Sequence, residues 1–217
     1  MSSYSYNGHP AIVGIGGLTS EVGKTTLLCQ LLNAFPGWEA IKTTRGHYRS
    51  CGKDPHTCCV SDLLSDEPTV QSGYELTFSP GKDTGRYWEA GAGNVHWVIG
   101  TDDQIEAGIS EALGKVQGAG VFIEGNSFTE FVKPDFFVMV VRDGQLKMKS
   151  TARRALKHAS AIYVSAAGAS GSSTPLVPTV LADLNVDVPI FSTANVAELV
   201  DYLTAKLTAK TFAVSRR

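Results

Sequence analysis

Short apolar runs alternate with amphipathic stretches along the chain, and this alternation predicts the order of strands and helices. The apolar runs, together with one alternating run, predict strands over 11–15, 39–42, 74–78, 95–99, 121–124, 136–141, 161–164 and 188–191. Apolar residues at helical spacing predict helices over 24–35, 102–116, 150–158 and 195–208. Because strands and helices alternate, we predict an α/β fold, with a mostly parallel β-sheet and helices on both faces.

Two segments interrupt this alternation. Residues 166–175 are small and polar, which is typical of a loop. Residues 43–71 contain three of the four cysteines and predict an insertion loop, and loops of this length beside a sheet are commonly functional. The 217 residues suffice for one sizeable core, so we predict a single domain over 1–217.

The composition argues against several classes of protein. With 43% hydrophobic and 18% charged residues, the chain has the composition of an ordinary globular protein. A formal net charge of -2 argues against a broad electrostatic surface for nucleic acid. We find no apolar run that could span a bilayer and no leader, so we expect a cytoplasmic protein that engages neither membrane nor nucleic acid. The one basic cluster, 147–157, predicts either a solvated helix face or an anion-binding surface.

The segment GGLTSEVGKTT at 16–26 joins the first predicted strand to the first predicted helix and predicts a phosphate-binding loop. Backbone N–H groups at such a junction face phosphate oxygens, Lys24 can reach the β and γ phosphates, and the Thr25 hydroxyl can hold Mg²⁺. The usual pattern has a glycine where Leu18 stands, but here Gly17 lies one place earlier. The nucleotide-binding residues expected in the loop are Thr19, Ser20, Glu21, Val22, Gly23, Lys24, Thr25 and Thr26.

A neighbouring strand should supply a carboxylate for the metal ion. The apolar run at 121–124 ends in Glu124 and is followed by Gly125, where the chain turns away from the carboxyl edge of the sheet. Glu124 is therefore the candidate for coordinating or orienting Mg²⁺. The alternative is a glutamate that only faces solvent at the end of its strand.

The segment PGKDTGRYWEAGA at 80–92 is a second group of glycine and polar residues. By itself it predicts a glycine turn and then a helix that Asp83 or Thr84 caps and Gly91 ends. Together with the loop, this segment resembles the molybdopterin-guanine dinucleotide biosynthesis protein B family. Members of that family carry a Gly-Lys-Asp-Ser/Thr turn, an Arg and a Glu-Ala-Gly-Ala helix end.

The resemblance covers most of the chain in order, including Ile41-Lys42, Glu124-Gly125 and 188–191. The amino-acid sequence of the loop, with Glu21-Val22 before Gly-Lys-Thr, is also similar to that of dethiobiotin synthetases. The fold that both likenesses imply is the P-loop NTPase class that these families share with the nickel-inserting GTPases. Members of that class are commonly dimers across the nucleotide sites, so we expect a homodimer.

The resemblance implies roles for the second segment. Lys82 and Asp83 would face the γ-phosphate or its acceptor, with Asp83 assisting Mg²⁺ or the attacking group, and Arg86 would be available to an anionic substrate. The base stays open between ATP and GTP, because 163–167 lack the Asn-Lys-x-Asp turn of guanine-selective sites. The expected catalytic residues are Lys24, Asp83 and Glu124, and the expected Mg²⁺ ligands are Thr25, Asp83 and Glu124.

The predicted insertion loop has its own candidate chemistry. Cys51, His56, Cys58 and Cys59 could together hold Zn²⁺ or another thiophilic transition metal. Adjacent cysteines do not readily bind one ion together, so reduced loop thiols are the alternative. Cys29 lies on the first predicted helix, on a face that we expect to be buried in the core.

These observations lead to three functional hypotheses. The first is a Mg²⁺-dependent purine nucleoside triphosphate-binding protein, an NTPase or phosphoryl transferase in cofactor biosynthesis, with a small-molecule or protein partner in cofactor assembly. The second is a metallochaperone-type switch, in which hydrolysis reshapes the cysteine loop. The third is a ligase similar to dethiobiotin synthetase, which only the phosphate loop supports.

Overall fold

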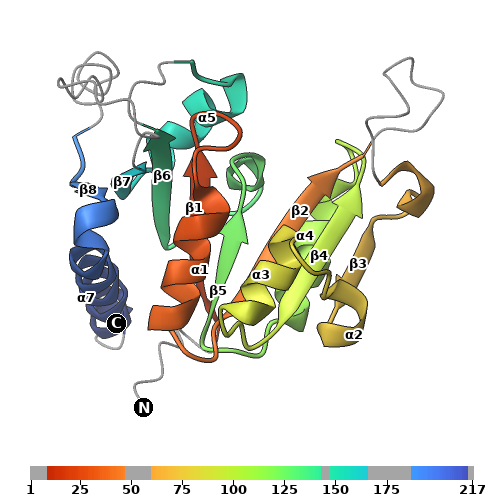
Figure 1. Ribbon diagram of the computed structural model, residues 1–217, viewed down its shortest axis with the longest axis horizontal. Coiled ribbons are helices and arrows are strands. Elements are labelled where there is room, and N and C mark those ends of the chain that lie inside the picture. The colour runs from red at the N-terminus through yellow and green to blue at the C-terminus, as the bar shows by residue number, and fades with distance from the viewer. Residues whose placement is uncertain (1–8, 47–59, 143–146, 166–186, 215–217) are drawn as a thin grey trace.

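The computed structural model describes residues 9–46, 60–142, 147–165 and 187–214. It is built on one eight-stranded sheet with the strand order β3-β4-β2-β5-β1-β6-β7-β8 (Figure 1). All neighbouring strands are parallel except the edge strand β3, which pairs with β4 in the antiparallel sense. The strands are β1 (Ala11–Gly17), β2 (Glu39–Arg45), β3 (Thr69–Ser72), β4 (Val95–Gly100), β5 (Gly120–Glu124), β6 (Phe136–Arg142), β7 (Ala161–Ser165) and β8 (Ile190–Ser192).

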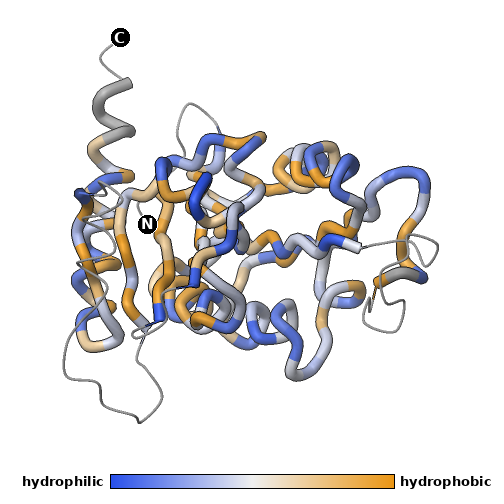
Figure 2. The backbone as a smooth tube through the Cα atoms, turned by 90° about the horizontal axis from the view of Figure 1, so that it is seen from above, coloured by the Kyte–Doolittle hydropathy of each residue, from blue (hydrophilic) through white to orange (hydrophobic). Residues whose placement is uncertain are grey.

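Helices cover both faces of this sheet, as the view from above shows (Figure 2). One face is covered by α1 (Lys24–Ala34), α3 (Asp83–Glu89) and α7 (Val196–Val214), and the other by α4 (Ile105–Lys115) and α5 (Ser150–Ala155). The shorter elements are α2 (Tyr74–Thr77), η2 (Ser61–Leu63), η3 (Ser127–Glu130), η4 (Leu156–His158) and η5 (Thr193–Asn195). The predicted α/β class and mostly parallel sheet are confirmed.

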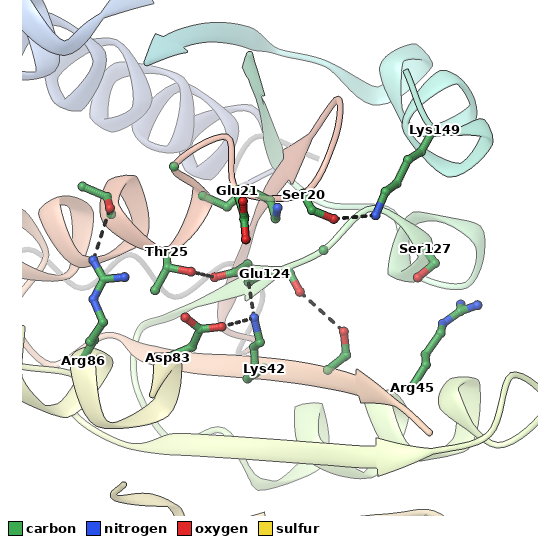
Figure 3. A pocket seen from close by; sticks show the side chains of 15 residues that line it. Ser20, Glu21, Thr25, Lys42, Arg45, Asp83, Arg86, Glu124, Ser127 and Lys149 are labelled. Atoms are coloured by element: carbon green, nitrogen blue, oxygen red, sulfur yellow. Dashed lines mark hydrogen bonds and ion pairs between the residues drawn. The ribbon is translucent and has the colours of Figure 1, made fainter. Parts of the chain in front are cut away.

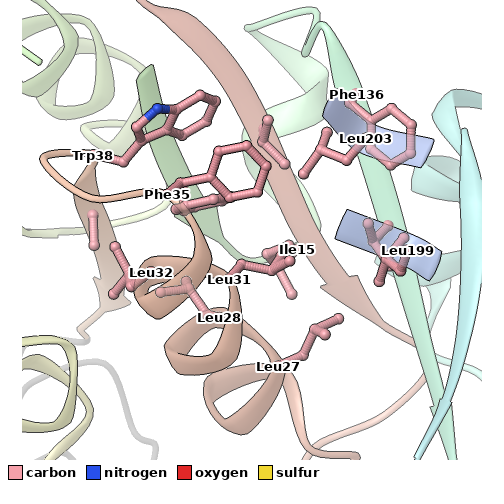
Figure 4. Close-up of a cluster of buried hydrophobic side chains, with 14 of the residues drawn as sticks. Ile15, Leu27, Leu28, Leu31, Leu32, Phe35, Trp38, Phe136, Leu199 and Leu203 are labelled. Atoms are coloured by element: carbon pink, nitrogen blue, oxygen red, sulfur yellow. The ribbon is translucent and has the colours of Figure 1, made fainter. Parts of the chain in front are cut away.

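Two buried clusters lie on the two faces, and the alternation of side chains along each strand decides which cluster a residue joins. In β6, Phe136, Val138 and Val140 belong to the cluster under α1 and α7, which we call the first cluster (Figure 4). The residues between them, Phe137 and Met139, belong to the second cluster, under α4 and α5. A strand buried on both faces is hydrophobic along its length, which is why the sequence pattern located these strands.

The helix α1 contributes four leucines to the first cluster, at the positions that the sequence predicted. Leu27, Leu28, Leu31 and Leu32 are each no more than 1% exposed. Cys29, expected in the core, is instead half-buried at its edge, and its thiol donates to the Arg86 carbonyl at 3.5 Å. Burial raises the pKa of this thiol above its ordinary value, the Arg86 charge opposing that shift. None of the described helices is both long and apolar enough to cross a membrane.

The strand predicted over 74–78 is wrong. These residues form the short helix α2, in which Thr77 donates its hydroxyl to the Gly73 carbonyl and the rings of Tyr74 and Phe78 stack with centroids 4.6 Å apart. The alternating pattern Tyr-Glu-Leu-Thr-Phe also places its two aromatic residues four positions apart, which is the spacing of neighbours on a helix. Leu76, which the alternating pattern placed on a strand, is 61% exposed and therefore does not belong to a buried strand face.

The predicted loop over 43–71 is also shorter than expected. Strand β2 continues to Arg45, and Thr69–Ser72 forms the edge strand β3. All four residues of β3 are only partly buried, so they lack the apolar signal of the central strands.

Candidate functional site

The expected loop lies at the carboxyl ends of β1, β2 and β5, beside a cavity with a volume of about 660 Å³ (Figure 3). This is the edge of a parallel sheet at which α/β proteins bind ligands. From the loop and α1, the cavity is lined by Ser20, Glu21, Gly23, Lys24, Thr25 and Thr26. The other lining residues are Lys42, Thr43, Arg45, Asp83, Arg86, Glu124, Gly125, Ser127 and Lys149. Thr19 and Val22, also expected to bind nucleotide, belong to the loop but do not line the cavity.

The loop favours glycine at position 17 because the Val22 side chain packs against it. A side-chain Cβ at Gly17 would lie 2.6 Å from Val22, closer than real Cβ contacts, and 3.0 Å from the Lys24 side chain. Leu18, which stands where the usual glycine would be, is 3% exposed and packs in the second cluster. The loop therefore keeps its close turn one residue early and uses position 18 for packing.

Two residues of the loop have left-handed backbone conformations. Gly23 has φ of 95°, and Glu21, with φ of 58°, is the one non-glycine residue of the described segments with a positive φ. Such a conformation is unfavourable for a residue with a side chain, and strained residues of this kind cluster at active sites and ligand-binding sites.

Asn126 joins this loop to the end of β5. Its amide oxygen accepts from the Gly17 N–H at 2.9 Å, and its amide nitrogen donates to the Gly17 carbonyl at 2.9 Å. The side chain thus pairs with both backbone groups of one residue, as a neighbouring strand would. The sequence pattern at the end of β5 indicated Glu124 alone and gave no signal for Asn126.

Glu124 is at the centre of the site and is not the solvent-facing glutamate of the alternative interpretation. It is 5% exposed. One carboxylate oxygen accepts from the Thr25 hydroxyl at 2.8 Å and from the buried Tyr87 hydroxyl at 2.5 Å, and the other accepts from the Lys42 ammonium at 2.8 Å. Groups from α1, α3 and β2 therefore converge on one carboxylate.

Lys42 links Asp83, the second carboxylate that we expected in the site, to Glu124. Its ammonium lies 2.6 Å from Asp83 and 2.8 Å from Glu124. Burial alone would lower the pKa of Lys42, but the Glu124 and Asp83 charges outweigh it and raise that pKa. Burial likewise opposes ionisation of Asp83, yet hydrogen bonding to Lys42 holds the pKa of Asp83 below its ordinary value. Lys42 was quoted in the family resemblance but was not predicted as a site residue.

Lys24, the lysine of the loop, has a different environment. Its ammonium donates to the Thr19 carbonyl at 3.4 Å. Burial lowers the pKa of Lys24, and the nearby Lys42 and Lys149 charges add to this effect, while Glu124 opposes it. The ammonium is therefore destabilised in the free protein and would gain from a bound anion.

Further basic groups surround the cavity. Arg86 donates to the Thr26 hydroxyl at 3.2 Å, and Lys149 donates to the Ser20 hydroxyl at 2.7 Å. Lys149 comes from the basic cluster at 147–157, so one residue of that cluster faces the site, while Arg153 is exposed on α5. The loop pattern alone could not indicate Lys149, which is 129 residues from Ser20.

Only some of the predicted residues in the segment 80–92 line the cavity. Asp83 lies in the site, and the prediction that Asp83 or Thr84 caps the helix is wrong, because Lys82 is the N-terminal boundary of α3 and no side chain caps it. Gly91, predicted to end the helix, follows it with φ of 84°. Lys82 is exposed and does not line the cavity, so its role stays a prediction.

The predicted metal-binding loop cannot be placed. Its four candidate ligands lie outside the described residues: Cys51, His56, Cys58 and Cys59. The segment 163–167, considered for recognition of the base, is described only as far as residue 165. Over the described segments, no three His, Cys, Asp or Glu side chains come together as a metal-ion site. Asp83 and Glu124, with the Thr25 hydroxyl, are a smaller set of oxygen donors at the cavity.

Removal of the Tyr87 hydroxyl should destabilise the fold. Tyr87 is fully buried, and burial, with the Glu124 charge, raises its pKa well above the ordinary value, so the phenol is a neutral donor. We expect Tyr87→Phe to lower the free energy of unfolding by about 1–3 kcal/mol, because a buried acceptor loses its partner. Urea titration measures this, with Tyr74→Phe as control, since Tyr74 is half-exposed. Equal stability of both variants would contradict the buried hydrogen bond.

No protein-family model matches the chain, and no curated protein matches it in sequence. Solved structures match it in fold. HypB from Helicobacter pylori, solved in complex with nickel, is 13% identical and has a TM-score of 0.51, and the match covers 93% of this chain and 89% of that one. The shared fold is that of the P-loop NTPases.

Two further structures are less similar. LpxK from Aquifex aeolicus, solved with ATP, is 15% identical with a TM-score of 0.45, over 84% of this chain and 70% of that one. A plasmid partition protein from Borrelia burgdorferi is 12% identical with a TM-score of 0.31, over 85% and 78% of the two chains. TM-scores below 0.5 do not by themselves establish a common fold.

Proposed function

We propose that the protein binds a purine nucleoside triphosphate with Mg²⁺ and transfers or hydrolyses its γ-phosphoryl group. The observation that carries this proposal is the convergence of Thr25 and Lys42 on Glu124, with Asp83 paired to the same Lys42, beside the loop that holds Lys24. Phosphoryl transfer requires mainly positioning and neutralisation of charge, and these groups supply both.

The donor atoms at this point suit Mg²⁺. A hydroxyl and two carboxylates are hard oxygen donors, which this ion prefers together with phosphate oxygens and water. Thr25, Asp83 and Glu124 would hold the ion, and the ion would neutralise charge on the phosphates. Tyr87 would keep the Glu124 carboxylate in one orientation.

The chain's own cations would act on the phosphates. Backbone N–H groups from Ser20 to Gly23 and the first turn of α1 would hold the β-phosphate, and Lys24 would contact its oxygens and those of the γ-phosphate. Lys42, now paired with carboxylates, is within the same cavity and would neutralise the transferred group. Arg86 lies beside Thr26 and would contact the α-phosphate end.

The physiological role that we propose is in cofactor biosynthesis, with a homodimer as the working form. The support is the resemblance of the 16–26 and 80–92 segments to the molybdopterin-guanine dinucleotide protein B family. The structure adds that both segments meet at one cavity.

Calorimetric titration with non-hydrolysable ATP and GTP analogues tests this proposal. Saturable binding that requires Mg²⁺ is the expected result, and the two titrations together determine the base preference. If neither analogue binds in the presence of Mg²⁺, the proposed function is wrong.

Replacing Asp83 with Asn should separate binding from turnover. Asparagine keeps the size of the side chain but loses its charge, while Lys42 keeps its pair with Glu124. We expect nucleotide affinity to change by less than about threefold, because the amide oxygen can still reach the ion. Turnover should fall by about 100-fold, the order expected if the Asp83 carboxylate also assists the attacking group by proton transfer. Steady-state release of phosphate measures this, with the exposed Asp103→Asn as the control. Turnover at the wild-type rate would remove Asp83 from the reaction.

A further inference from the structure

The cavity extends over both faces of the sheet edge. Thr25 and Thr26 belong to α1, and Asp83 and Arg86 to α3, and both helices pack on the first cluster. Three other lining residues come from the opposite side. Ser127 is the first residue of η3 and Lys149 precedes α5, and residues of both elements pack on the second cluster. Arg45 is the last residue of β2 and pairs with Asp102, which precedes α4.

Figure 3 shows the same division around Glu124. Thr25, Asp83 and Arg86 lie on one side of it, while Ser127 and Arg45 lie together on the other, with Lys149 above them beside Ser20. A triphosphate held by the N-terminus of α1 would occupy the first side. The second side therefore remains for whatever approaches the γ-phosphoryl group.

The geometry of phosphoryl transfer indicates what could bind on this second side. The attacking and leaving oxygens of a transferred phosphoryl group lie roughly in line, so the acceptor approaches from the side opposite the β-phosphate. We propose that Arg45, Ser127 and Lys149 form the acceptor subsite, and that the acceptor is a small molecule carrying a phosphate or carboxylate group. This inference rests on the proposed function.

The charges of the cavity favour an anionic acceptor. Five basic and three acidic side chains line it, and two of the acidic ones, Asp83 and Glu124, are already paired with Lys42. On the acceptor side, Arg45 presents a planar guanidinium, which suits two oxygens of a carboxylate or phosphate. Its partner Asp102 is 67% exposed, so this pair is a weak surface interaction that an incoming anion can replace.

The experiment is a titration of two anions into protein saturated with Mg²⁺ and the non-hydrolysable nucleotide. Glycerol 2-phosphate probes a phosphate monoester, succinate probes a carboxylate, and glycerol is the neutral control. We expect saturable binding of at least one anion and none of glycerol. Which anion binds more tightly identifies the acidic group of the acceptor.

Three variants make the test specific. Arg45→Gln should weaken anion binding by about tenfold or more, as expected for loss of a charge-assisted pair, and change nucleotide affinity by less than about twofold. Asp102→Asn should strengthen anion binding by about two- to fivefold, because it releases Arg45 from a surface pair. Arg153→Gln, on the exposed face of α5, should change neither affinity.

The outcomes distinguish this inference from the proposed function. If nucleotide binds and neither anion does, or if Arg45→Gln leaves anion affinity unchanged, the acceptor subsite is wrong and the proposed function stands. If Arg45→Gln weakens nucleotide binding as much as anion binding, Arg45 belongs to the triphosphate site and the subsite is also wrong. If no nucleotide binds, the proposed function fails, and the same titration without nucleotide decides whether Arg45 and Lys149 hold an anion.

Discussion

Substituting Lys24 by alanine is expected to weaken binding of Mg²⁺ and nucleoside triphosphate by about 100-fold or more, because each charge-assisted hydrogen bond to phosphate contributes about 1.5–3 kcal/mol. In the free protein the Lys24 ammonium lies in the loop, with the Thr19 carbonyl as its hydrogen-bond acceptor. Lys24 lines the cavity in which the phosphates would bind. Calorimetry with the non-hydrolysable analogue measures the change.

The same substitution should not destabilise the protein through its charge. Because burial lowers the pKa of Lys24 in the folded state, folding disfavours its ammonium, and removing the ammonium removes that cost. Thermal unfolding of Lys24→Ala should therefore occur at or above the wild-type temperature. Lys115→Ala is the matched control, since Lys115 is exposed on α4 and should affect neither property. Unchanged affinity in a folded Lys24→Ala variant would refute the site assignment.

The sequence was most informative where the signal is local. Strand, loop and helix at 11–34 are contiguous, so the apolar run, the glycines and Lys24-Thr25 could be interpreted together. Glu124 was also predictable, because a strand that is apolar throughout and ends in one acid indicates the polar edge of the sheet. Lys42 lacks this signal, because it lies within β2 after only two apolar residues, Ala40 and Ile41.

The remaining site residues depend on contacts between distant parts of the chain. Tyr87 was part of a predicted helix, but only the packing of α3 against α1 brings its hydroxyl to Glu124. Asn126 binds a peptide 109 residues away. An isolated tyrosine or asparagine in a sequence has no pattern that would reveal such a partner. The edge elements were missed for a different reason, because partly exposed residues do not follow the periodicity of a buried face.

A second polar network is buried at the opposite end of the sheet, near the start of β2 and β4. Glu39 is 4% exposed, and His96 is fully buried. One Glu39 oxygen lies 2.7 Å from a His96 ring nitrogen, and the other accepts from the backbone N–H groups of Gln117 and Gly118 at 2.8 and 2.6 Å. The second ring nitrogen of His96 lies 2.8 Å from the Ser72 hydroxyl. This network ties β2, β3 and β4 to the turn before β5.

Replacing Glu39 with Gln should lower the free energy of unfolding at pH 7 by about 1–3 kcal/mol, since it leaves a buried hydrogen-bond donor without its acceptor. The amide keeps one acceptor oxygen, whereas the carboxylate accepts hydrogen bonds on both of its oxygens. Glu111→Gln is the control, because Glu111 forms an exposed pair with Lys115 on α4 and should contribute less than about 0.5 kcal/mol.

The dependence on pH provides the sharper test. Burial opposes ionisation of Glu39, but hydrogen bonds from His96 and the two backbone N–H groups outweigh it and hold its pKa below the ordinary value of 4.5. A carboxylate with a lowered folded pKa stabilises the protein above its ordinary pKa, and that contribution is lost as the pH falls through the folded value. The difference in stability between wild type and Glu39→Gln should thus shrink as the pH falls below 4.5. Urea titrations across this range measure it, and a difference that persists unchanged at acid pH would show that Glu39 stabilises the fold by its shape alone.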